Sequence, residues 1–400
     1  MPTVVQKFGG SSLASLDKLA EVADLVTATR QTGSGLVVVV SAMGKTTEGL
    51  LELAKQAGIV GLPRGAAPSP EPPRREFDML VSTGERVSMA LLSIALQARG
   101  TSAVSLTGSQ AGIVTSDRHF DAEILEIQPQ RIQQQLARGR VVIVAGYQGV
   151  SRSREITTLG RGGSDTTAVA LAAVLGAERC EIYSDVDGVY TADPRRVAGA
   201  QHLSTIDYPT LQAMADAGAK VVNARAVAWG ARHAVAIHAR ATADFASGGS
   251  GRETRVLPAA DGGNARAVVA CPRLAVLSAE SDAAEILLAA IREAELPVRD
   301  ARVLAGRAIV TIPLTSVPDF EQRTAWLARR EIAGLSVEEH CAEICALGRG
   351  VEQQADALLG ALGRSARLTL SEPARLSAVI EPEAVLEAER DWHRLLVEAA

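Results

Sequence analysis

A glycine-rich hexapeptide, Gly160 to Asp165, stands directly before an alanine-rich stretch, 166–175, whose composition predicts a helix. Such a loop presents backbone N–H groups and the positive end of the helix dipole, which suits a phosphate or a carboxylate. Arg161 adds a guanidinium that can bind either anion through two hydrogen bonds. The carboxylates of Asp165, Asp185 and Asp187 would repel such an anion unless a cation lay between them, and Mg²⁺ on nucleotide phosphates is the usual solution. These residues therefore predict a nucleotide and anion site.

A second anion site is predicted near the start of the chain. The β-branched run 3–8 predicts a strand that brings Lys7 to the mouth of a glycine turn, Gly9 to Ser12, and helical spacing follows over 13–30. A lysine at such a strand end can lie against phosphoryl oxygens. The alternative is that Lys7 is a surface charge beside a tight turn, and these residues alone leave both interpretations open.

Two further segments carry polar groups that could bind a substrate. Ser41 to Thr47 follows a buried strand, 36–40, and contains Gly-Lys-Thr, but the first glycine of a P-loop is replaced by Val39 inside that strand, which excludes a P-loop. Glu85 lies in a predicted helix, 77–99. A glutamate at this position is either a solvated charge or a partner for an ammonium group.

The elements that must position these residues alternate between strands and helices. Buried strands are predicted at 3–8, 36–40, 103–106, 141–145 and 180–183, with a strand and a helix at 122–127 and 131–137 between them and a last strand at 235–238. This alternation predicts an α/β fold with an open, mostly parallel sheet covered by helices on both faces. Sites in such sheets lie at the carboxyl ends of the strands, where all of the segments above fall.

Composition narrows the function further. A net charge of −5 gives no basic surface for nucleic acid, and no apolar run approaches the length of a membrane span. The N-terminus lacks the pattern of a signal peptide, so we expect a cytoplasmic protein whose four cysteines stay thiols. His340, Cys341 and Cys345 are spaced as on one strand rather than as zinc ligands, so we predict no metal there.

Six motifs follow one another along the chain and carry a family resemblance. They are Lys7 to Ser12, Ser41 to Thr47, Ser82 to Glu85, Gly146 to Gly149, the pair Gly160 to Asp165 and Tyr183 to Arg195, and Gly218 to Val221. Together they resemble the aspartokinases of the amino acid kinase family, strongly over residues 1–260 and weakly beyond. The resemblance implies a transfer of the γ-phosphoryl of ATP, with Mg²⁺, to the side-chain carboxylate of L-aspartate. The product would be 4-phospho-L-aspartate, made in the first step of aspartate-family amino acid biosynthesis.

The resemblance also implies roles for individual residues. The catalytic residues would be Lys7, Asp165 and Arg161. The substrate-binding residues would be Thr47, Glu85, Arg161, Gly162, Gly163 and Ser164. The ATP-binding residues would be Lys7, Phe8, Gly9, Gly10, Ser184, Asp185, Tyr190, Asp193, Pro194, Arg195 and Lys220. No side chain is assigned to the metal, and Asn223-Ala224 departs from the His-Pro of many relatives.

The last third of the chain shows a different pattern. Two successive β-α-β-β-α patterns predict two ferredoxin-like modules, which resemble the paired ACT domains of aspartokinases. We therefore expect a catalytic domain at 1–245, a linker at 246–265, and ACT-like modules at 266–332 and 333–400. Such modules bind lysine or threonine and pair subunits into a homo-oligomer. Neither 278–282 nor 348–351 carries the family's Pro-Gly, so we expect weakened feedback.

Two other functions remain open from the sequence. The same fold serves kinases that act on glutamate, carbamate or nucleoside monophosphates, although Thr47 together with the motifs around Glu85 and Arg161 favours aspartate. The chain could also be a non-catalytic regulatory subunit of the ACT type. Against this, the joint presence of Lys7, Glu85, Arg161 and Asp165 is not needed by a pure sensor.

Overall fold

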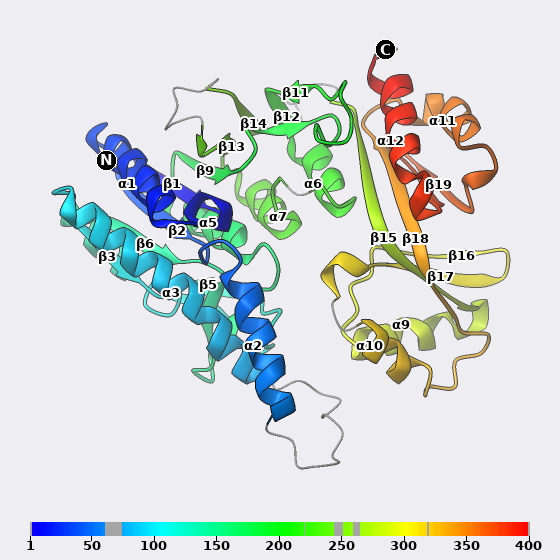
Figure 1. Ribbon diagram of the computed structural model, residues 1–400, viewed down its shortest axis with the longest axis horizontal. Coiled ribbons are helices and arrows are strands. Elements are labelled where there is room, and N and C mark those ends of the chain that lie inside the picture. Colours follow the sequence, from blue (N-terminus) through cyan, green and yellow to red (C-terminus); the bar gives the residue numbers. More distant parts are fainter. Residues whose placement is uncertain are drawn as a thin grey trace. The chain divides into compact units, whose positions relative to one another are not determined.

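The computed structural model describes residues 2–60, 74–219, 221–243, 251–258, 265–317 and 320–398 (Figure 1). The chain divides into two compact units, of which the first comprises Met1–Val189, Leu203–Gln212 and Lys220–Gly263. The second comprises Tyr190–His202, Ala213–Ala219 and Asn264–Ala400. Most of the proline-rich segment 61–75 lies outside the described residues, as does Lys220.

The first unit is built on an eight-stranded sheet in the order β12-β14-β13-β9-β1-β2-β6-β3. Every neighbouring pair is parallel except β13 with β14. The strands are β1 (Thr3–Phe8), β2 (Gly35–Val40), β3 (Ala103–Leu106), β6 (Val141–Ala145), β9 (Arg179–Ser184), β12 (Thr205–Asp207), β13 (Ile237–Ala241) and β14 (Glu253–Leu257). The predicted α/β class and mostly parallel sheet are confirmed.

Helices cover both faces of this sheet. They are α1 (Leu16–Gln31), α2 (Thr46–Val60), α3 (Arg74–Ala98), α4 (Gln130–Ala137), α5 (Gly163–Leu175) and α7 (Ala224–His233), with α6 (Tyr208–Asp216) at the boundary of the two units. Alternate residues of β1 face opposite sides, so Val4 and Phe8 pack with α1 and α3 in one core cluster. Lys7 therefore points to the other face, which α5 covers.

A four-stranded sheet in the order β5-β4-β7-β8 also belongs to the first unit. Its strands are β4 (Ile113–Thr115), β5 (Ile124–Ile127), β7 (Gln148–Ser151) and β8 (Ile156–Thr158). The strand predicted at 122–127 corresponds to β5, and the other three were not predicted. Their segments are three or four residues long and rich in Gly, Ser and Thr, so they carry little periodicity.

Two predicted boundaries were wrong in the first unit. Helix α5 begins at Gly163, three residues earlier than predicted, so Ser164 and Asp165 stand in its first turn. The strand at 235–238 is not the last of its sheet, because β14 follows it within the range expected to be a linker. The glycines and serines that suggested a linker mark only the stretch before β14.

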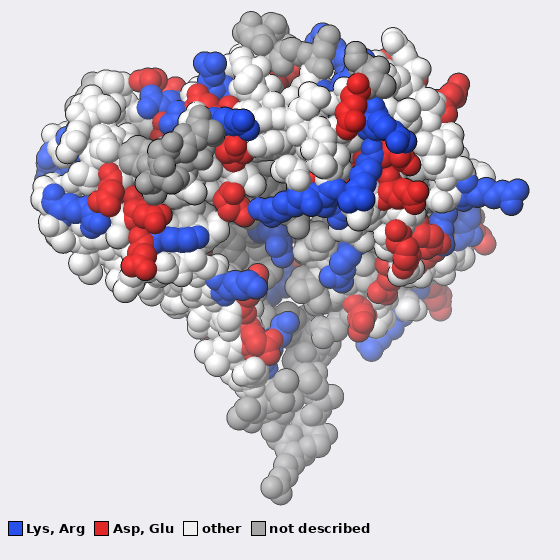
Figure 2. Space-filling model, turned by 45° about the horizontal axis from the view of Figure 1, so that its top comes forward, with Lys and Arg blue, Asp and Glu red and all other residues white. Residues whose placement is uncertain are grey.

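Helix α3 is the one described helix whose length and hydropathy would allow it to cross a membrane. Half of that apolar window is buried in the first unit, where Met89, Leu92 and Leu96 join the core between α1 and the sheet. This is the packing of a core helix in a globular domain. Basic and acidic side chains are interspersed over the face that Figure 2 shows, as expected from 41 basic and 46 acidic residues.

The second unit contains a six-stranded antiparallel sheet in the order β16-β17-β15-β18-β20-β19. Its strands are β15 (Ala267–Glu280), β16 (Asp300–Leu304), β17 (Arg307–Pro313), β18 (Ser336–Leu347), β19 (Leu368–Glu372) and β20 (Arg375–Ile380). Its helices are α9 (Ala284–Glu293), α10 (Phe320–Leu327), α11 (Ala355–Leu362) and α12 (Val385–His393), which a π-helical turn (Arg394–Glu398) extends. The chain thus shows the predicted β-α-β-β-α pattern twice.

The two copies share their central strands. β15 and β18, the long strands side by side in Figure 1, pair along most of their length. The early part of β15 contributes Val268 to the core beneath α11 and α12, whereas its later part contributes Leu277 to the core beneath α9 and α10. A boundary at residue 332 therefore divides the helices but not the strands, and the partition into two ACT-like modules remains a prediction.

Candidate active site

Four of the predicted segments begin where neighbouring parallel strands end. β9, β1, β2 and β6 are adjacent in the sheet and end at the same edge, because all four run in one direction. Three backbone hydrogen bonds continue from the sheet into these loops: Gly9 N to Tyr183 O (3.2 Å), Ser41 N to Phe8 O (3.1 Å) and Gly146 N to Val40 O (3.0 Å). The edge thus collects the loops that sequence analysis singled out.

Lys7 and Asp165 meet at this edge. The ammonium Nζ of Lys7 lies 2.6 Å from the carboxylate Oδ1 of Asp165, and both side chains are nearly nine-tenths buried. Lys7 is brought there by β1, and Asp165 by the first turn of α5. The pair places a cation at the positive end of a helix, so the Lys7 side chain and the backbone amides of α5 together favour an anion.

The glycine loop before α5 is held by Asn223. Gly162 has a φ of +73°, and an added Cβ would collide with the side chain of Asn223. Asn223 Nδ2 donates to the backbone oxygen of Arg161 (3.0 Å), while its Oδ1 accepts from the backbone N–H of Arg225 (2.9 Å) and caps α7. Because only glycine fits both the backbone angle and this contact, the loop carries Gly162 at the site of closest approach. Asn223 was noted in the sequence only as a departure from the family.

Glu85 is buried rather than solvated. It is 3% exposed, and its Oε1 accepts from the backbone N–H of Ala42 at 3.2 Å. Its other oxygen, Oε2, is buried without a hydrogen-bond partner among the described residues. Burial raises the pKa of Glu85 to about 7, although the Ala42 hydrogen bond opposes the shift. A buried carboxylate with one oxygen uncommitted suits a ligand ammonium group.

Asp78 is a second buried carboxylate, which sequence analysis missed. It accepts hydrogen bonds from His119 Nδ1 (2.7 Å), the backbone N–H of Phe120 (3.1 Å) and Thr158 Oγ1 (2.5 Å). These bonds join α3 to the loop before β5 and to the end of β8. The signal was present in the sequence, since Asp78 and Glu85 lie seven residues apart and therefore on the same face of the helix.

The other predicted substrate residues lie around the same loops. Thr47 is half-buried in the first turn of α2, and Arg161 is exposed within the glycine loop. Gly163 and Ser164 are buried, and an added Cβ at Gly146 would stand 2.8 Å from Ser164 Oγ. The end of β6 and the first turn of α5 are therefore in direct contact.

The predicted nucleotide residues are divided between the two units. Phe8, Gly9, Gly10, Ser184 and Asp185 belong to the first unit. The side chain of Phe8 is fully buried and stacks on Tyr183, so only its backbone is left for a ligand. An added Cβ at Gly10 would meet the backbone oxygens of Ala42 and Gly44 at 2.9 Å, so this turn requires glycine.

The remaining residues that are predicted to bind the nucleotide do not belong to the described part of the first unit. Tyr190, Asp193, Pro194 and Arg195 belong to the second unit, in a segment where Asp193 Oδ1 accepts from the backbone N–H of Arg195 at 2.9 Å. Lys220 lies outside the described residues. The roles of all these residues stay predictions.

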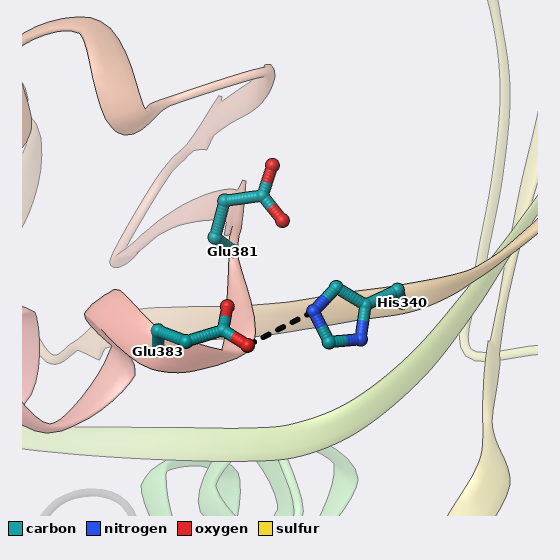
Figure 3. A group of neighbouring side chains, drawn as sticks. All are labelled: His340, Glu381 and Glu383. Atoms are coloured by element: carbon teal, nitrogen blue, oxygen red, sulfur yellow. Dashed lines mark hydrogen bonds and ion pairs between the residues drawn. The ribbon is translucent and has the colours of Figure 1, made fainter.

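One group of side chains in the second unit has the composition of a metal site. His340, Glu381 and Glu383 lie close together, and the dashed line in Figure 3 marks the contact of His340 Nε2 with Glu383 Oε1 at 3.0 Å. His340 and Glu383 are largely exposed, and Glu381 forms an ion pair with Arg367. This is a surface ion-pair network. The four cysteines are buried free thiols, as expected.

The comparisons with known proteins fit this geometry. The sequence pattern of the amino acid kinase family matches residues 2–238, which include β1, the glycine loop and the four adjacent strand ends. The chain belongs to the amino acid kinase family. An aspartokinase of Mycobacterium tuberculosis is 49% identical over 243 residues, covering 60% of this chain and 55% of the relative. An aspartokinase of Corynebacterium efficiens is 51% identical over 228 residues, covering 57% and 52%. The match thus spans about half the length of these curated relatives.

Solved structures extend the likeness of this amino acid kinase over the whole chain. Aspartate kinase from Synechocystis is 32% identical with a TM-score of 0.55, and the match covers 98% of this chain and 69% of the relative. Aspartokinase III of E. coli, in complex with aspartate and ADP, has a TM-score of 0.82 at 24% identity and covers 98% of this chain and 99% of that one. The second likeness concerns the fold, and it includes both units.

Proposed function

We propose that this amino acid kinase transfers the γ-phosphoryl of ATP to the side-chain carboxylate of L-aspartate, giving 4-phospho-L-aspartate and ADP. The observation that carries the proposal is the buried Lys7–Asp165 pair, which stands at the shared edge of four strand ends next to the glycine loop. A carboxylate acceptor is already ionised at neutral pH, so the reaction needs no general base. Catalysis can therefore rest on alignment and charge neutralisation.

Lys7 is the residue that stabilises the migrating phosphoryl group in this mechanism. Its ammonium is fixed by Asp165, and the glycine turn at Gly9 lies beside it, since an added Cβ on Gly9 would lie 3.5 Å from Lys7 Nζ. A preorganised cation at a partly buried site stabilises developing charge more strongly than one in water. Asp165 sets the position of that cation.

Glu85 and Arg161 are the residues that favour an amino acid acceptor over a carbamate or a nucleoside monophosphate. The free oxygen of Glu85 pairs with the ammonium of an amino acid, and the exposed guanidinium of Arg161 binds a carboxylate in two places. Thr47 and the segment Gly162 to Ser164 complete the proposed acceptor site. A carbamate or a nucleoside monophosphate would leave Glu85 without a cation, which disfavours these acceptors.

ATP brings Mg²⁺ with it in this proposal. Carboxylate oxygens are ligands that Mg²⁺ prefers, and Asp185 and Asp187 in the loop after β9 would supply them, whereas Asp165 in the first turn of α5 is paired with Lys7. When bound, the ion would supply positive charge that offsets the negative charge of the nucleotide phosphates. The family resemblance assigns the nucleotide to Ser184, Asp185, Tyr190, Asp193 to Arg195 and Lys220, and we retain these roles as part of the proposal.

An acceptor panel tests the proposal directly. ADP release is measured with ATP, Mg²⁺ and each of aspartate, glutamate, carbamate and a nucleoside monophosphate. Turnover with aspartate and not with the other acceptors supports the proposed function. If another acceptor is turned over faster, that acceptor takes the place of aspartate in the proposal. No turnover with any of them would favour a non-catalytic regulatory subunit.

The proposal also covers the role of the second unit and the place of the enzyme in the cell. We propose that it acts as two ACT-like modules that pair subunits into a homo-oligomer, in a cytoplasmic enzyme of aspartate-family amino acid biosynthesis. Feedback by lysine or threonine is weakened because the Pro-Gly turns are missing at 278–282 and 348–351. Titration calorimetry with each amino acid tests this point, and tight binding of either would refute it.

A further inference from the structure

The segment 190–202, called the nucleotide loop here, carries Tyr190, Asp193, Pro194 and Arg195, the residues predicted to bind ATP. Although it follows β9 of the first unit in sequence, it belongs to the compact second unit. It is a largely irregular segment whose backbone turns at Asp193, where the carbonyl oxygen accepts from the N–H groups of Arg196 and Val197 at 2.9 Å. Such a loop depends on side-chain contacts for a single conformation.

The first anchor of the nucleotide loop is Thr191. Its backbone oxygen accepts from Val268 N in β15 (2.7 Å), and its hydroxyl oxygen accepts from the backbone N–H of Gln201 (2.9 Å). The same hydroxyl lies 2.8 Å from Nε2 of His393, which is fully buried in α12. The carboxylate of Glu398 only accepts, so Nδ1–H of His393 donates to Glu398 Oε1 (3.0 Å), and in the neutral imidazole Nε2 then accepts from the Thr191 hydroxyl.

The second anchor is Arg196, next to the predicted nucleotide residue Arg195. Its Nε lies 2.6 Å from Oε2 of Glu389, a carboxylate of α12 that is 2% exposed. Arg390 on the same helix donates from Nε to the backbone oxygen of Arg196 at 3.1 Å. Burial raises the pKa of Glu389, and the guanidinium of Arg196 opposes that shift. A buried charge pair of this kind defines one position for the residues it joins.

Helix α12 is arranged so that it can hold the loop. Its apolar residues Val385, Ala388 and Trp392 fall at helical spacing and pack in the core of the second unit. Glu389 and His393 lie one turn apart on the same helix and are also buried, but they are polar. Both side chains contact the nucleotide loop. Their partners lie about 200 residues earlier in the chain, with separations of 193 and 202 positions.

We infer that Glu389 and His393 are positioning residues for the nucleotide, which act by holding the loop 190–202 in its binding conformation. The inference rests on the proposed function, because it takes the predicted ATP residues of this loop as given. A loop that is released from these anchors samples more conformations, so ATP must then order it on binding. The C-terminal helix of the chain is thereby part of the nucleotide-binding machinery, while the acceptor site is independent of it.

The test compares Glu389→Gln with Glu387→Gln, an exposed glutamate on the same helix, in the full chain. Thr191→Val, which removes the hydroxyl that contacts His393 and the backbone N–H of Gln201, is the second variant. The dissociation constant of Mg·ADP is measured by calorimetry, which needs no acceptor, and KM values for ATP and aspartate are measured in turnover. We expect Glu389→Gln and Thr191→Val to weaken ADP binding and raise KM for ATP about ten-fold. KM for aspartate should stay unchanged, Glu387→Gln should behave as the wild type, and Glu389→Asp should recover part of the affinity.

The inference is overturned if both variants keep their thermal transition and bind Mg·ADP as tightly as Glu387→Gln, or if KM for aspartate rises as much as KM for ATP. Its failure can be told apart from a failure of the proposed function. Wild-type protein that binds Mg·ADP but shows no turnover with aspartate refutes the acceptor and leaves the inference testable by calorimetry. Wild-type protein that does not bind Mg·ADP overturns both.

Discussion

Lys7 Nζ and Asp165 Oδ1 lie 2.6 Å apart and join the end of the central strand β1 to the first turn of α5. The two residues are 158 positions apart in the sequence, and each side chain is nearly nine-tenths buried. One partner is the proposed catalytic cation and the other fixes its position, so the pair contributes both to the stability of the fold and to the rate of the reaction. Substitutions can separate the effect on stability from the effect on rate.

Lys7→Ala should lower kcat by about 100-fold or more, because a preorganised cation at the phosphoryl group is lost. It should also destabilise the first unit by roughly 3–5 kcal/mol, since Asp165 stays buried without its cation. The matched variant Lys7→Met with Asp165→Asn removes both charges, so it should recover most of the stability and none of the activity. Steady-state kinetics and thermal unfolding check both effects, and unchanged turnover of Lys7→Ala would remove Lys7 from the mechanism.

Burial of Glu85 should lower the stability of the free enzyme by an amount that depends on pH. Its pKa is about 7 in the fold because of burial, against about 4.5 in an unfolded chain. Between these values the unfolded chain loses a proton that the folded chain keeps, so stability falls as the pH rises from about 4.5 to 7 and stays lower above. The cost is at most about 3 kcal/mol. Glu85→Gln should be more stable than wild type at pH 8 and equal to it below pH 4.5 in unfolding curves.

The same carboxylate should make aspartate binding depend on pH. Only ionised Glu85 pairs with an ammonium, so KM for aspartate should fall as the pH rises through about 7 and then level off. Glu85→Gln should raise KM for aspartate at pH 8 and remove this pH dependence, with KM for ATP unchanged. A pH profile of KM that is the same in both proteins would show that Glu85 does not meet the ammonium.

Arg161 should act on substrate affinity without an effect on stability. It is exposed in the glycine loop, so Arg161→Ala should change the free energy of unfolding by less than about 0.5 kcal/mol. Loss of a contact that makes two hydrogen bonds to a carboxylate should raise KM for aspartate about 10- to 100-fold. The variant Arg161→Lys should restore little of the affinity for aspartate, because an ammonium group cannot make this paired contact. Arg152→Ala, an exposed arginine in the turn after β7, serves as the control. Equal KM values for the two variants would remove Arg161 from the acceptor site.

The sequence alone was enough for the strands that build the edge of the site. The runs at 36–40 and 141–145 are continuous and apolar, those at 3–8 and 103–106 are short and contain valine, and the structure has strands at all four within one residue. The start of α5 was predicted too late, because glycines are poor helix formers and the contacts that require them, of Gly162 with Asn223 and of Gly163 with Leu159, are tertiary. The assignment of residues 190–202 to the second unit could not be predicted either, since it depends on Thr191 and Arg196 meeting α12 about 200 residues later.

Asp78 should hold the acceptor loops in place. Both of its oxygens accept hydrogen bonds, from His119, Phe120 and Thr158, and Thr158 ends the strand that leads into the glycine loop. Asp78→Asn removes the negative charge that strengthens these three hydrogen bonds, and its NH₂ group can replace an acceptor oxygen only if His119 Nδ1 changes from donor to acceptor. We expect a loss of about 1–3 kcal/mol and a thermal transition lower by several degrees.

Asp78→Asn should weaken the binding of the acceptor more than the binding of ATP. A loosened glycine loop misplaces Arg161, so KM for aspartate should rise more than KM for ATP. Glu76→Gln, an exposed glutamate at the start of the same helix, provides the matched control and should leave both KM values and the thermal transition unchanged. If Asp78→Asn lowers the thermal transition but shifts both KM values equally, the carboxylate supports the fold of the first unit and not the geometry of the acceptor site.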